Sequence, residues 1–541
     1  MVLDRRGVRL PSRLPPSHSS SVQSRVTRIH RTDVRVPLAA VIALYLASPA
    51  PLLAQRPSGG SVRVSTDHWT NAYIGRLRER GLLLGLNPLV QPWRAVDIAR
   101  ELTKLNADTL PELLRGWITL LKEEYGWRTG TQGAASVRGG GSLLGAVRAS
   151  TSQRLDPARP LGDEGAWPRY QAGGWFEAAP VAAELRLLGD VYFLDDPDGI
   201  DPEQSRGARS DFAYVAADFP VGSLELGRLA RNWSRTDVYG LMVSDAATPY
   251  PQIGFDIRAW RFVVRAFTGE LEIIDGRKRY IAGHRIDYES PNLVLSFGEV
   301  NVYAPYEGGF SLRWLNPLES FFFEGDNLPL DATNNLMLDL QLWARVGSFT
   351  LNGEGALDDF DLSPPEGVDP APARYAFRLG ARWVPPAGRV SLLASYEQAS
   401  SYAYRTASGF DGYSFLSRGI GENYADFDRL SASVEYTPPV RGLIVSSSAL
   451  MLRQGEGDFR QPFGDYNEFR ANPALFLGIR EDTYRLGFAG RYQPIRFAWL
   501  AWDLGYNWIR NRNHVQDAEE HLFSAAAELG VRIDFPFRSG S

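Results

Sequence analysis

Cysteine is absent from this chain of 541 residues, which excludes disulfide bonds, cysteine-ligated metals and thiol nucleophiles. Lysine is scarce and occurs only at Lys104, Lys122 and Lys278. The formal net charge is −5, and acidic and basic residues are interspersed along the chain. Because nucleic-acid binding needs a clustered basic face, we expect no nucleic-acid partner.

Long apolar runs are missing after the N-terminal segment, so the mature chain is expected to contain no membrane-spanning helix. Near the N-terminus, several arginines between Arg5 and Arg35 precede an uncharged run over residues 36–55. This order predicts export with a signal peptide over residues 1–54, which has an unusually long basic region and a cleavage position at Ala54. A membrane-anchoring helix is the alternative interpretation of the same run.

Motifs of known catalytic chemistry are missing as well. The six histidines show no metal-ligand spacing, and the chain has no G-x-S-x-G elbow, P-loop or H-E-x-x-H sequence. The sequence therefore predicts no catalytic residue, no metal site and no cofactor, and we expect that the protein is not an enzyme. A pair of glycosidase carboxylates is unsupported, although the composition does not exclude one.

Strict alternation of apolar and polar residues is abundant, and it is clearest in residues 522–537. Small and charged side chains, including Glu528, Arg532 and Asp534, occupy one parity. Because the side chains of a strand alternate between its faces, the other parity forms one apolar face. Its residues are Phe523, Ala525, Ala527, Leu529, Val531, Ile533, Phe535 and Phe537. The length and the terminal aromatic residues are typical of the closing strand of an outer-membrane barrel.

The same pattern recurs in segments of about ten residues that are separated by turns rich in Pro and Gly. Strands of soluble sheets average five or six residues, which argues against a soluble β-sandwich. We therefore predict an all-β transmembrane barrel over residues 142–541, with about 16–18 antiparallel strands, of which 18 is favoured. The apolar parities of these segments begin at Val181, Trp260, Leu336, Tyr375, Leu430 and Leu500.

The opposite parities carry Arg, Asp and Glu, which predicts a wet lumen lined by paired charges. Within residues 336–346, Leu340 is predicted to face lipid and Gln341 to face the lumen. An arginine in place of Leu340 should therefore be costly, whereas an arginine in place of Gln341 should cost much less.

Residues 61–127 have helical periodicity. Apolar residues recur at helical spacing around Tyr73, around Ile98 and within residues 110–125, which predicts three helices. A linker rich in Gly, Ala and Ser over residues 128–141 separates this region from the barrel. We expect a small periplasmic helical domain, and its size favours docking onto another surface.

Residues 224–335 contain short elements in a distinctive order. A Gly-Arg pair and a Trp come first, followed by a Ser/Ala/Pro element, a His-Arg strand, a Gly-Glu strand end and an Asn-Pro element. In this order they resemble the Wzi family of capsule assembly proteins, and the helical region and the strand pattern extend the resemblance over most of the mature chain. The matching positions are Gly227, Arg228, Trp233, Ser244, His284, Arg285, Gly298, Glu299, Asn316 and Pro317.

The resemblance implies an 18-stranded outer-membrane barrel with a periplasmic helical domain that binds and retains capsular or other surface polysaccharide. His68-Trp69 and residues 94–99 also resemble S-layer-homology modules. That second resemblance implies an alternative function, a diffusion channel tethered to peptidoglycan. The expected partners are surface polysaccharide and outer-membrane lipid, with peptidoglycan under the alternative, and we expect a monomer.

Two segments rich in aromatic residues and arginine are the candidates for glycan binding. Ring faces stack on sugars, and Arg donates hydrogen bonds to their acidic substituents. The alternative is that these side chains belong to an aromatic girdle or to plug packing. The candidates are Tyr303, Tyr306, Arg313 and Trp314 in the first segment and Tyr404, Arg405 and Tyr413 in the second.

Overall fold

The computed structural model describes residues 59–128, 137–199, 207–327, 332–359, 372–464 and 471–539. The predicted signal peptide, residues 1–54, lies outside the described residues. No helix in the described ranges is both long and apolar enough to cross a membrane.

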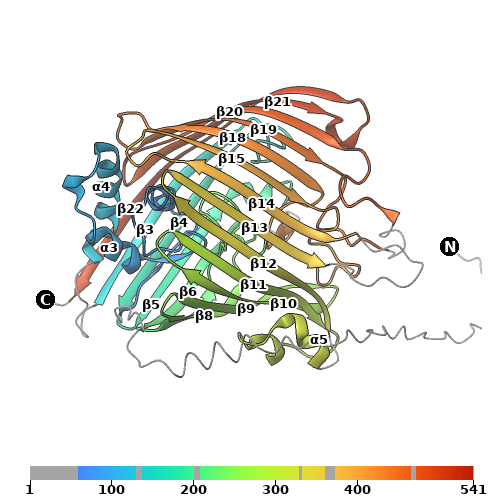
Figure 1. Ribbon diagram of the computed structural model, residues 1–541, viewed down its shortest axis with the longest axis horizontal. Helices are drawn as coiled ribbons and strands as arrows, with labels where there is room; N and C mark the ends of the chain where they lie inside the picture. The colour runs from blue at the N-terminus through green and yellow to red at the C-terminus, as the bar shows by residue number, and fades with distance from the viewer. Residues whose placement is uncertain are drawn as a thin grey trace, which may run out of the picture. The chain divides into compact units, whose positions relative to one another are not determined.

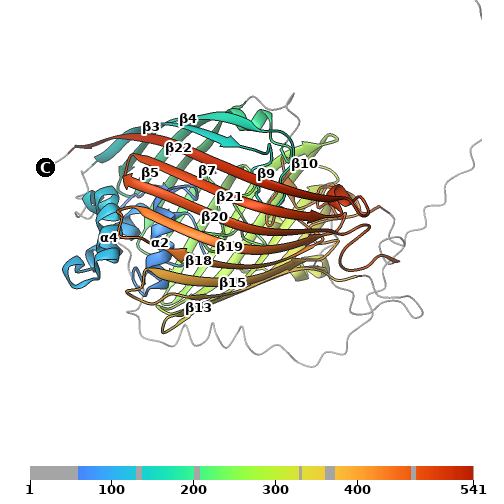
Figure 2. The ribbon, with the colours of Figure 1, turned by 90° about the horizontal axis from the view of Figure 1, so that it is seen from above.

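Eighteen antiparallel strands of the described residues close into one barrel (Figures 1 and 2). Closure comes from pairing of the last strand with the first, with Phe537 opposite Gly139. The predicted fold class and the favoured strand number are confirmed. The strands are β3 (Val137–Ser150), β4 (Gly165–Ala178), β5 (Val181–Asp190), β6 (Ala208–Phe219), β7 (Gly222–Arg228), β8 (Pro251–Ala259), β9 (Phe262–Ile274), β10 (Arg277–Glu289), β11 (Leu293–Pro305), β12 (Ala332–Val346), β13 (Phe349–Asp359), β14 (Arg374–Trp383), β15 (Val390–Ala399), β18 (Phe427–Tyr436), β19 (Leu443–Gln454), β20 (Glu481–Ile495), β21 (Ala498–Arg510) and β22 (Glu519–Ser539).

The two ends of the barrel differ in their connections. At the end where β3 begins and β22 finishes, the strands are joined by short turns such as residues 179–180 and 260–261. We call this the turn end. The opposite end, the loop end, carries most of the long connections, including residues 191–207, 229–250, 306–331 and 400–426. Short turns on one side and long loops on the other are typical of outer-membrane barrels.

The predicted strand parities are confirmed by exposure. Leu340 on β12 is 66% exposed on the outer wall, whereas the adjacent Gln341 is 1% exposed. On β22, Phe523, Leu529 and Phe535 are likewise exposed. The outer surface of the barrel is therefore the apolar face that the sequence predicts.

Two local predictions are wrong. Trp260 does not start a strand, because it occupies the turn between β8 and β9 with a φ of 57°. The alternation that begins at Val181 continues in the sequence through Val191 and Phe193, but the strand ends at Asp190, because residues 191–194 form the 3₁₀-helix η3 (Val191–Leu194). The Asp190 carboxylate accepts a hydrogen bond from the Tyr192 backbone N–H and begins that turn.

The N-terminal helical region packs at the turn end. Its helices are α2 (Thr70–Glu79), α3 (Ala95–Thr103) and α4 (Glu112–Tyr125), and a short sheet pairs β1 (Arg63–Val64) with β2 (Trp93–Arg94). These helices share a buried apolar cluster that includes Ala182 and Ile444 of the barrel wall. Arg63 donates to Asp218 at 2.9 Å and to Glu225 at 2.6 Å on the wall. We call residues 59–128 the plug.

The lumen contains a hydrophobic cluster as well as paired charges, so the predicted wet lumen is only partly correct. Two loop-end connections, residues 229–250 and 400–426, fold into the barrel and bury Met242, Tyr404 and Tyr413 against the wall. The Tyr413 hydroxyl donates to the Met242 carbonyl at 2.8 Å, which joins the two loops. The first loop also pairs with the plug, because Gln91 and Asn232 exchange backbone hydrogen bonds of 2.9 and 3.1 Å.

This packing describes the surroundings of position 341, for which the sequence predicts that an arginine costs little. The Gln341 amide donates to the Trp233 carbonyl at 2.7 Å, and the Arg285 guanidinium lies beside the Gln341 side-chain oxygen. An arginine at this position would bury a second guanidinium next to Arg285. The Glu354 carboxylate also lies 3.3 Å from the Gln341 amide, so the low cost of an arginine at position 341 stays a prediction.

Replacing Leu340 with Arg should destabilise the barrel by about 2–4 kcal/mol, because the guanidinium would enter the lipid-facing band. Leu340→Phe keeps the position apolar and serves as the matched control with little expected change. Urea unfolding in lipid vesicles measures both free energies. Equal stability of the two variants would show that Leu340 does not face lipid.

Candidate functional site

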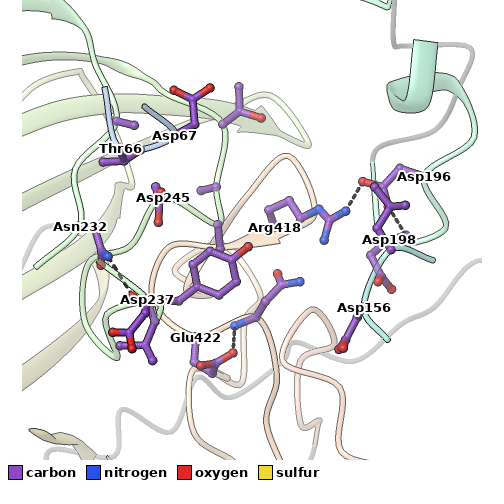
Figure 3. A pocket seen from close by; sticks show the side chains of 18 of the residues that line it. Thr66, Asp67, Asp156, Asp196, Asp198, Asn232, Asp237, Asp245, Arg418 and Glu422 are labelled. Atoms are coloured by element: carbon purple, nitrogen blue, oxygen red, sulfur yellow. Dashed lines mark hydrogen bonds and ion pairs between the residues drawn. The ribbon is translucent and has the colours of Figure 1, made fainter. Parts of the chain in front are cut away.

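A cavity of about 950 Å³ lies inside the barrel between the plug and the loop end (Figure 3). Side chains of β3, β4, β5 and β6 form one wall, and side chains of β14, β15 and β18 contribute the other. Plug residues 65–67 and the two inward-folded loops complete the lining. The volume lies at the upper end of the range of about 300–1,000 Å³ that is usual for ligand pockets.

Ion pairs fix the side chains at the plug side of the cavity. Asp67 of the plug accepts hydrogen bonds from Arg169 at 2.8 Å and from Arg186 at 3.3 Å. Arg186 also pairs with Asp211 on the adjacent strand at 2.6 Å. The plug therefore forms the floor of the cavity and is bonded to its wall.

The loop-end side of the cavity is also lined by acid–base pairs. Arg154 donates to Asp198 at 2.9 Å, and Arg418 extends toward Asp196, to which it is bonded (Figure 3). The Tyr424 hydroxyl donates to Asp156 at 2.6 Å. These groups leave hydrogen-bonding atoms of both kinds along the cavity.

Arg209 on β6 differs from the other arginines of this cavity. Within the residues that the structure describes, it is the one cavity arginine with no carboxylate within 4.0 Å. Its guanidinium donates to the Thr248 hydroxyl at 3.1 Å and lies 3.6 Å above the centroid of the Phe193 ring. The Nε atom is buried without a hydrogen-bond partner among the described residues. The Arg209 guanidinium can therefore donate hydrogen bonds to a carboxylate of a ligand.

Tyr239 gives the cavity an open aromatic surface. It is 47% exposed although it lines an interior cavity. Its backbone carbonyl accepts a hydrogen bond of 2.7 Å from Arg378, which fixes the chain at this residue. An exposed ring in a polar cavity offers a stacking surface for a sugar ring.

Glu422 anchors the second inward loop to the wall. It is 2% exposed, and Arg378 donates to it at 3.1 Å. Arg378 and Arg429 also bind Glu397, which lies next to Glu422. Burial and the neighbouring Glu397 carboxylate raise the pKa of Glu422 to about 7.

The first group of predicted glycan-binding residues lies away from this cavity. Tyr303 is fully buried, and Trp314 is 4% exposed beside it, with ring centroids 5.7 Å apart. Arg313 pairs with Glu324 at 3.1 Å. Tyr306 is 62% exposed, and the Arg277 guanidinium lies 5.2 Å from its ring centroid.

The second predicted group lies inside the barrel but is buried. Tyr404 and Tyr413 are 0% exposed and belong to the lumenal hydrophobic cluster. The Arg405 guanidinium donates to the backbone carbonyls of Gln461 and Pro462 at 2.9 and 3.3 Å. In this structure these three residues hold loops in place rather than line the cavity.

The positions that resemble Wzi form two spatial groups. In the lumen, Trp233 packs on Phe267 with ring centroids 5.3 Å apart, and Arg285 lies 5.2 Å from the Trp233 ring. Ser244 donates to the Gly421 carbonyl at 2.5 Å and ties the two inward loops together.

Two further motif positions, Gly227 and Arg228, support the same lumenal loop. Gly227 has a φ of 132°, and a Cβ there would lie 2.2 Å from the Ala213 carbonyl oxygen, so only glycine fits. Arg228 donates to the Pro249 carbonyl at 3.0 Å. The second spatial group comprises His284, Glu299 and the segment that carries Asn316 and Pro317, and it lies on the outer wall.

Sequence reasoning missed Arg209 and Tyr239. The available signal for Tyr239 was its place between Trp233 and Ser244, two of the motif positions. Arg209 has no distinguishing signal in the sequence, because its lack of a carboxylate partner among the described residues depends on distant loops. Among the described residues, no group of three or more His, Asp and Glu side chains could hold a metal ion.

Among solved structures, the chain is similar to Wzi of Escherichia coli, an outer-membrane protein involved in group 1 capsule assembly and a carbohydrate-binding β-barrel. The TM-score is 0.56 at 13% identity, over 87% of this chain and 99% of that one. Pseudomonas aeruginosa OccD3 aligns with a TM-score of 0.43 at 11% identity, over 74% and 91% of the two chains. No protein-family model and no curated protein matches the chain. At these identities the likeness to Wzi shows a shared outer-membrane barrel fold.

Glu422 should make stability depend on pH. Because the native-state pKa of about 7 exceeds the ordinary value of 4.5, its stabilising contribution is complete below pH 4.5 and is lost as pH rises through 7. The difference corresponds to a free energy on the order of 3 kcal/mol. Thermal unfolding in detergent between pH 4.5 and 8 should show this loss in the parent and a flatter profile in Glu422→Gln. The exposed Glu270→Gln is the control, and identical profiles for all three proteins would contradict the assignment.

Proposed function

We propose that this protein is an outer-membrane barrel that binds and retains a surface polysaccharide in its lumenal cavity. The observation that carries the proposal is that one cavity is lined both by an open aromatic ring, Tyr239, and by an arginine, Arg209, that has no carboxylate within 4.0 Å among the described residues. Glycan sites need a ring face for stacking and charged or polar groups for hydrogen bonds. The cavity provides both.

The chemistry of the cavity favours an acidic glycan. Arg209 binds a carboxylate with the strong, directional hydrogen bonds of a guanidinium. The remaining arginines are occupied by aspartates and glutamates, so their free N–H groups and carboxylate oxygens suit sugar hydroxyls rather than a second ligand charge. A cavity of about 950 Å³ holds a short stretch of polymer.

In the proposed orientation, the loop end faces the outside of the cell and the plug faces the periplasm. Barrels of this class place short turns in the periplasm and long loops outside. A polysaccharide then reaches the cavity past Asp198 and Arg418, while the floor at Asp67 keeps it from passing through. Wzi, which shares the fold, is described as carbohydrate-binding, and this agrees with the proposal.

The diffusion channel predicted as the alternative is less compatible with the lumen. The plug and the loop of residues 229–250 are hydrogen-bonded to each other inside the barrel, and hydrophobic packing fills the space beside them. The pattern around His68 that suggested peptidoglycan lies in the plug, where His68 packs against Trp69 and Tyr125. These contacts support retention over free diffusion.

Binding of defined oligosaccharides tests the proposal. Arg209→Gln should weaken binding of oligosaccharides that contain uronic acids about tenfold or more, because a charged hydrogen bond contributes about 1.5–3 kcal/mol. Binding of neutral oligosaccharides should change little. Fluorescence titration of the purified barrel with both classes of ligand measures the effect.

Two further variants complete this test. Tyr239→Ala should weaken binding of both classes, whereas Tyr436→Ala, at an outer-wall tyrosine of similar exposure, should not. Arg261→Gln is the matched control for Arg209, because Arg261 also lies over an aromatic ring and donates to one neutral hydroxyl. Failure of the parent to bind any glycan of either class, or equal losses in the controls, would refute the proposal.

Conductance measurements distinguish a barrel that retains polysaccharide from an open diffusion channel. The intact protein should show little steady current in planar bilayers, because the plug closes the floor of the cavity. Removal of residues 59–128 should raise the current, since the cavity already extends from the loop end to residues 65–67. A large, steady current through the intact protein would favour the channel, and an unchanged current after removal of the plug would contradict its role as the floor.

A further inference from the structure

The connection between β11 and β12 folds back along the outside of the barrel. Its described part, residues 306–327, contains η4 (Leu312–Leu315), η5 (Phe321–Phe323) and the short helix α5 (Glu324–Asn327). We call this segment the flap. Figure 1 shows α5 at the loop-end edge of the barrel beside β10.

The parity of the wall strands shows which side the flap covers. On β10 and β11, the outward positions nearer the turn end, Ile286 and Phe297, are 41% and 48% exposed. Further toward the loop end, His284, Glu299 and Tyr303 share these outward parities but are buried. The flap is what buries them.

Specific contacts seat the flap on the wall. The Ser320 hydroxyl and the Phe321 backbone N–H donate to the Glu299 carboxylate at 2.7 and 2.6 Å. The Phe321 ring lies 4.4 Å from the His284 ring, and His284 is 3.3 Å from Glu299. An outward carboxylate in a lipid-facing row is costly unless it is bonded and covered. The flap provides both the hydrogen bonds and the cover.

The opposite side of the flap is apolar. Leu312, Leu318 and Phe323 are 74%, 78% and 56% exposed, and Leu315 and Phe322 are exposed beside them. Within the flap, Arg313 pairs with Glu324 at 3.1 Å, and Glu319 accepts a hydrogen bond from Asn327 at 2.9 Å. The flap therefore has one side that bonds to the wall and one side that presents Leu and Phe outward.

We propose that the flap is embedded in the membrane, with Leu312, Leu318 and Phe323 among the lipid acyl chains of the leaflet at the loop end. The apolar side of the flap continues the lipid-facing surface of β11 and β12, where Phe297 and Leu340 are exposed. Acyl chains are the occupant that matches both this continuity and the exposed set of Leu312, Leu315, Leu318, Phe322 and Phe323. The inference is independent of glycan binding and assigns the segment around Trp314 to lipid instead.

Site-directed spin labelling tests the proposal cleanly, because the chain has no native cysteine. Single cysteines at Leu312 and Leu318 report on the flap, Leu340→Cys on the lipid-facing wall, and Val515→Cys on an exposed loop-end connection. In proteoliposomes, the flap labels should be accessible to oxygen and protected from a water-soluble nickel chelate, as at position 340. The label at position 515 should show the reverse.

Each pattern of accessibility at positions 312 and 318 either supports or overturns the membrane location of the flap. Nickel accessibility at positions 312 and 318 would place the flap in water and overturn the proposal. Protection from both reagents would mean that protein covers the flap, as in a second copy of the chain, and would also overturn it. An unboiled gel shift of each labelled variant confirms a folded barrel.

A second measurement tests whether Glu299 holds the flap against the barrel wall. Glu299→Ala removes the acceptor for Ser320 and Phe321, so the label at position 318 should become more mobile in its spectrum. Glu270→Ala, at an exposed glutamate on β9, should leave the spectrum unchanged. Unchanged mobility in Glu299→Ala would show that this carboxylate does not hold the flap.

Discussion

The structure depends on one constraint: the two faces of a closed sheet need different side chains, because one face meets lipid and the other faces the lumen. Each strand gives half of its side chains to the apolar outer wall and the other half to the lumen. Eighteen strands enclose more space than wall side chains fill, so other parts of the chain must occupy the interior. The plug and the loops of residues 229–250 and 400–426 meet this demand, and the cavity is the space that they leave.

The barrel could be predicted from sequence because alternation is a local property. Residues 522–537 or 336–346 reveal their two faces without reference to any other segment, and the exposures of Phe523 and Leu340 agree. The three plug helices were predictable for the same reason, since their apolar spacing is local. The turn at Trp260, which has a positive φ, was not predicted, because an aromatic residue there continues the alternating pattern of the adjacent strand.

The interior could not be predicted because it depends on contacts between distant segments. Nothing near Gln341 reveals that the Trp233 carbonyl will accept its hydrogen bond, or that Met242 will meet Tyr413. The candidate site has the same limitation, because Arg209 is distinguished by having no carboxylate partner among the described residues. The flap did have a local signal: His284 and Glu299 place polar groups on outward parities, which a lipid-facing strand avoids unless something covers them.

The pairing of β22 with β3, which closes the barrel, limits the order in which the plug and the wall can assemble. The plug is synthesised before the strands that carry its partners, and Arg63 finds Asp218 and Glu225 only when β6 and β7 exist. When the last strand closes against the first, whatever lies within the ring is enclosed by a continuous ladder of backbone hydrogen bonds. Entry through the wall is then closed, so the plug must reach Asp218 and Glu225 either before β22 pairs with β3 or afterwards through the turn end of the barrel.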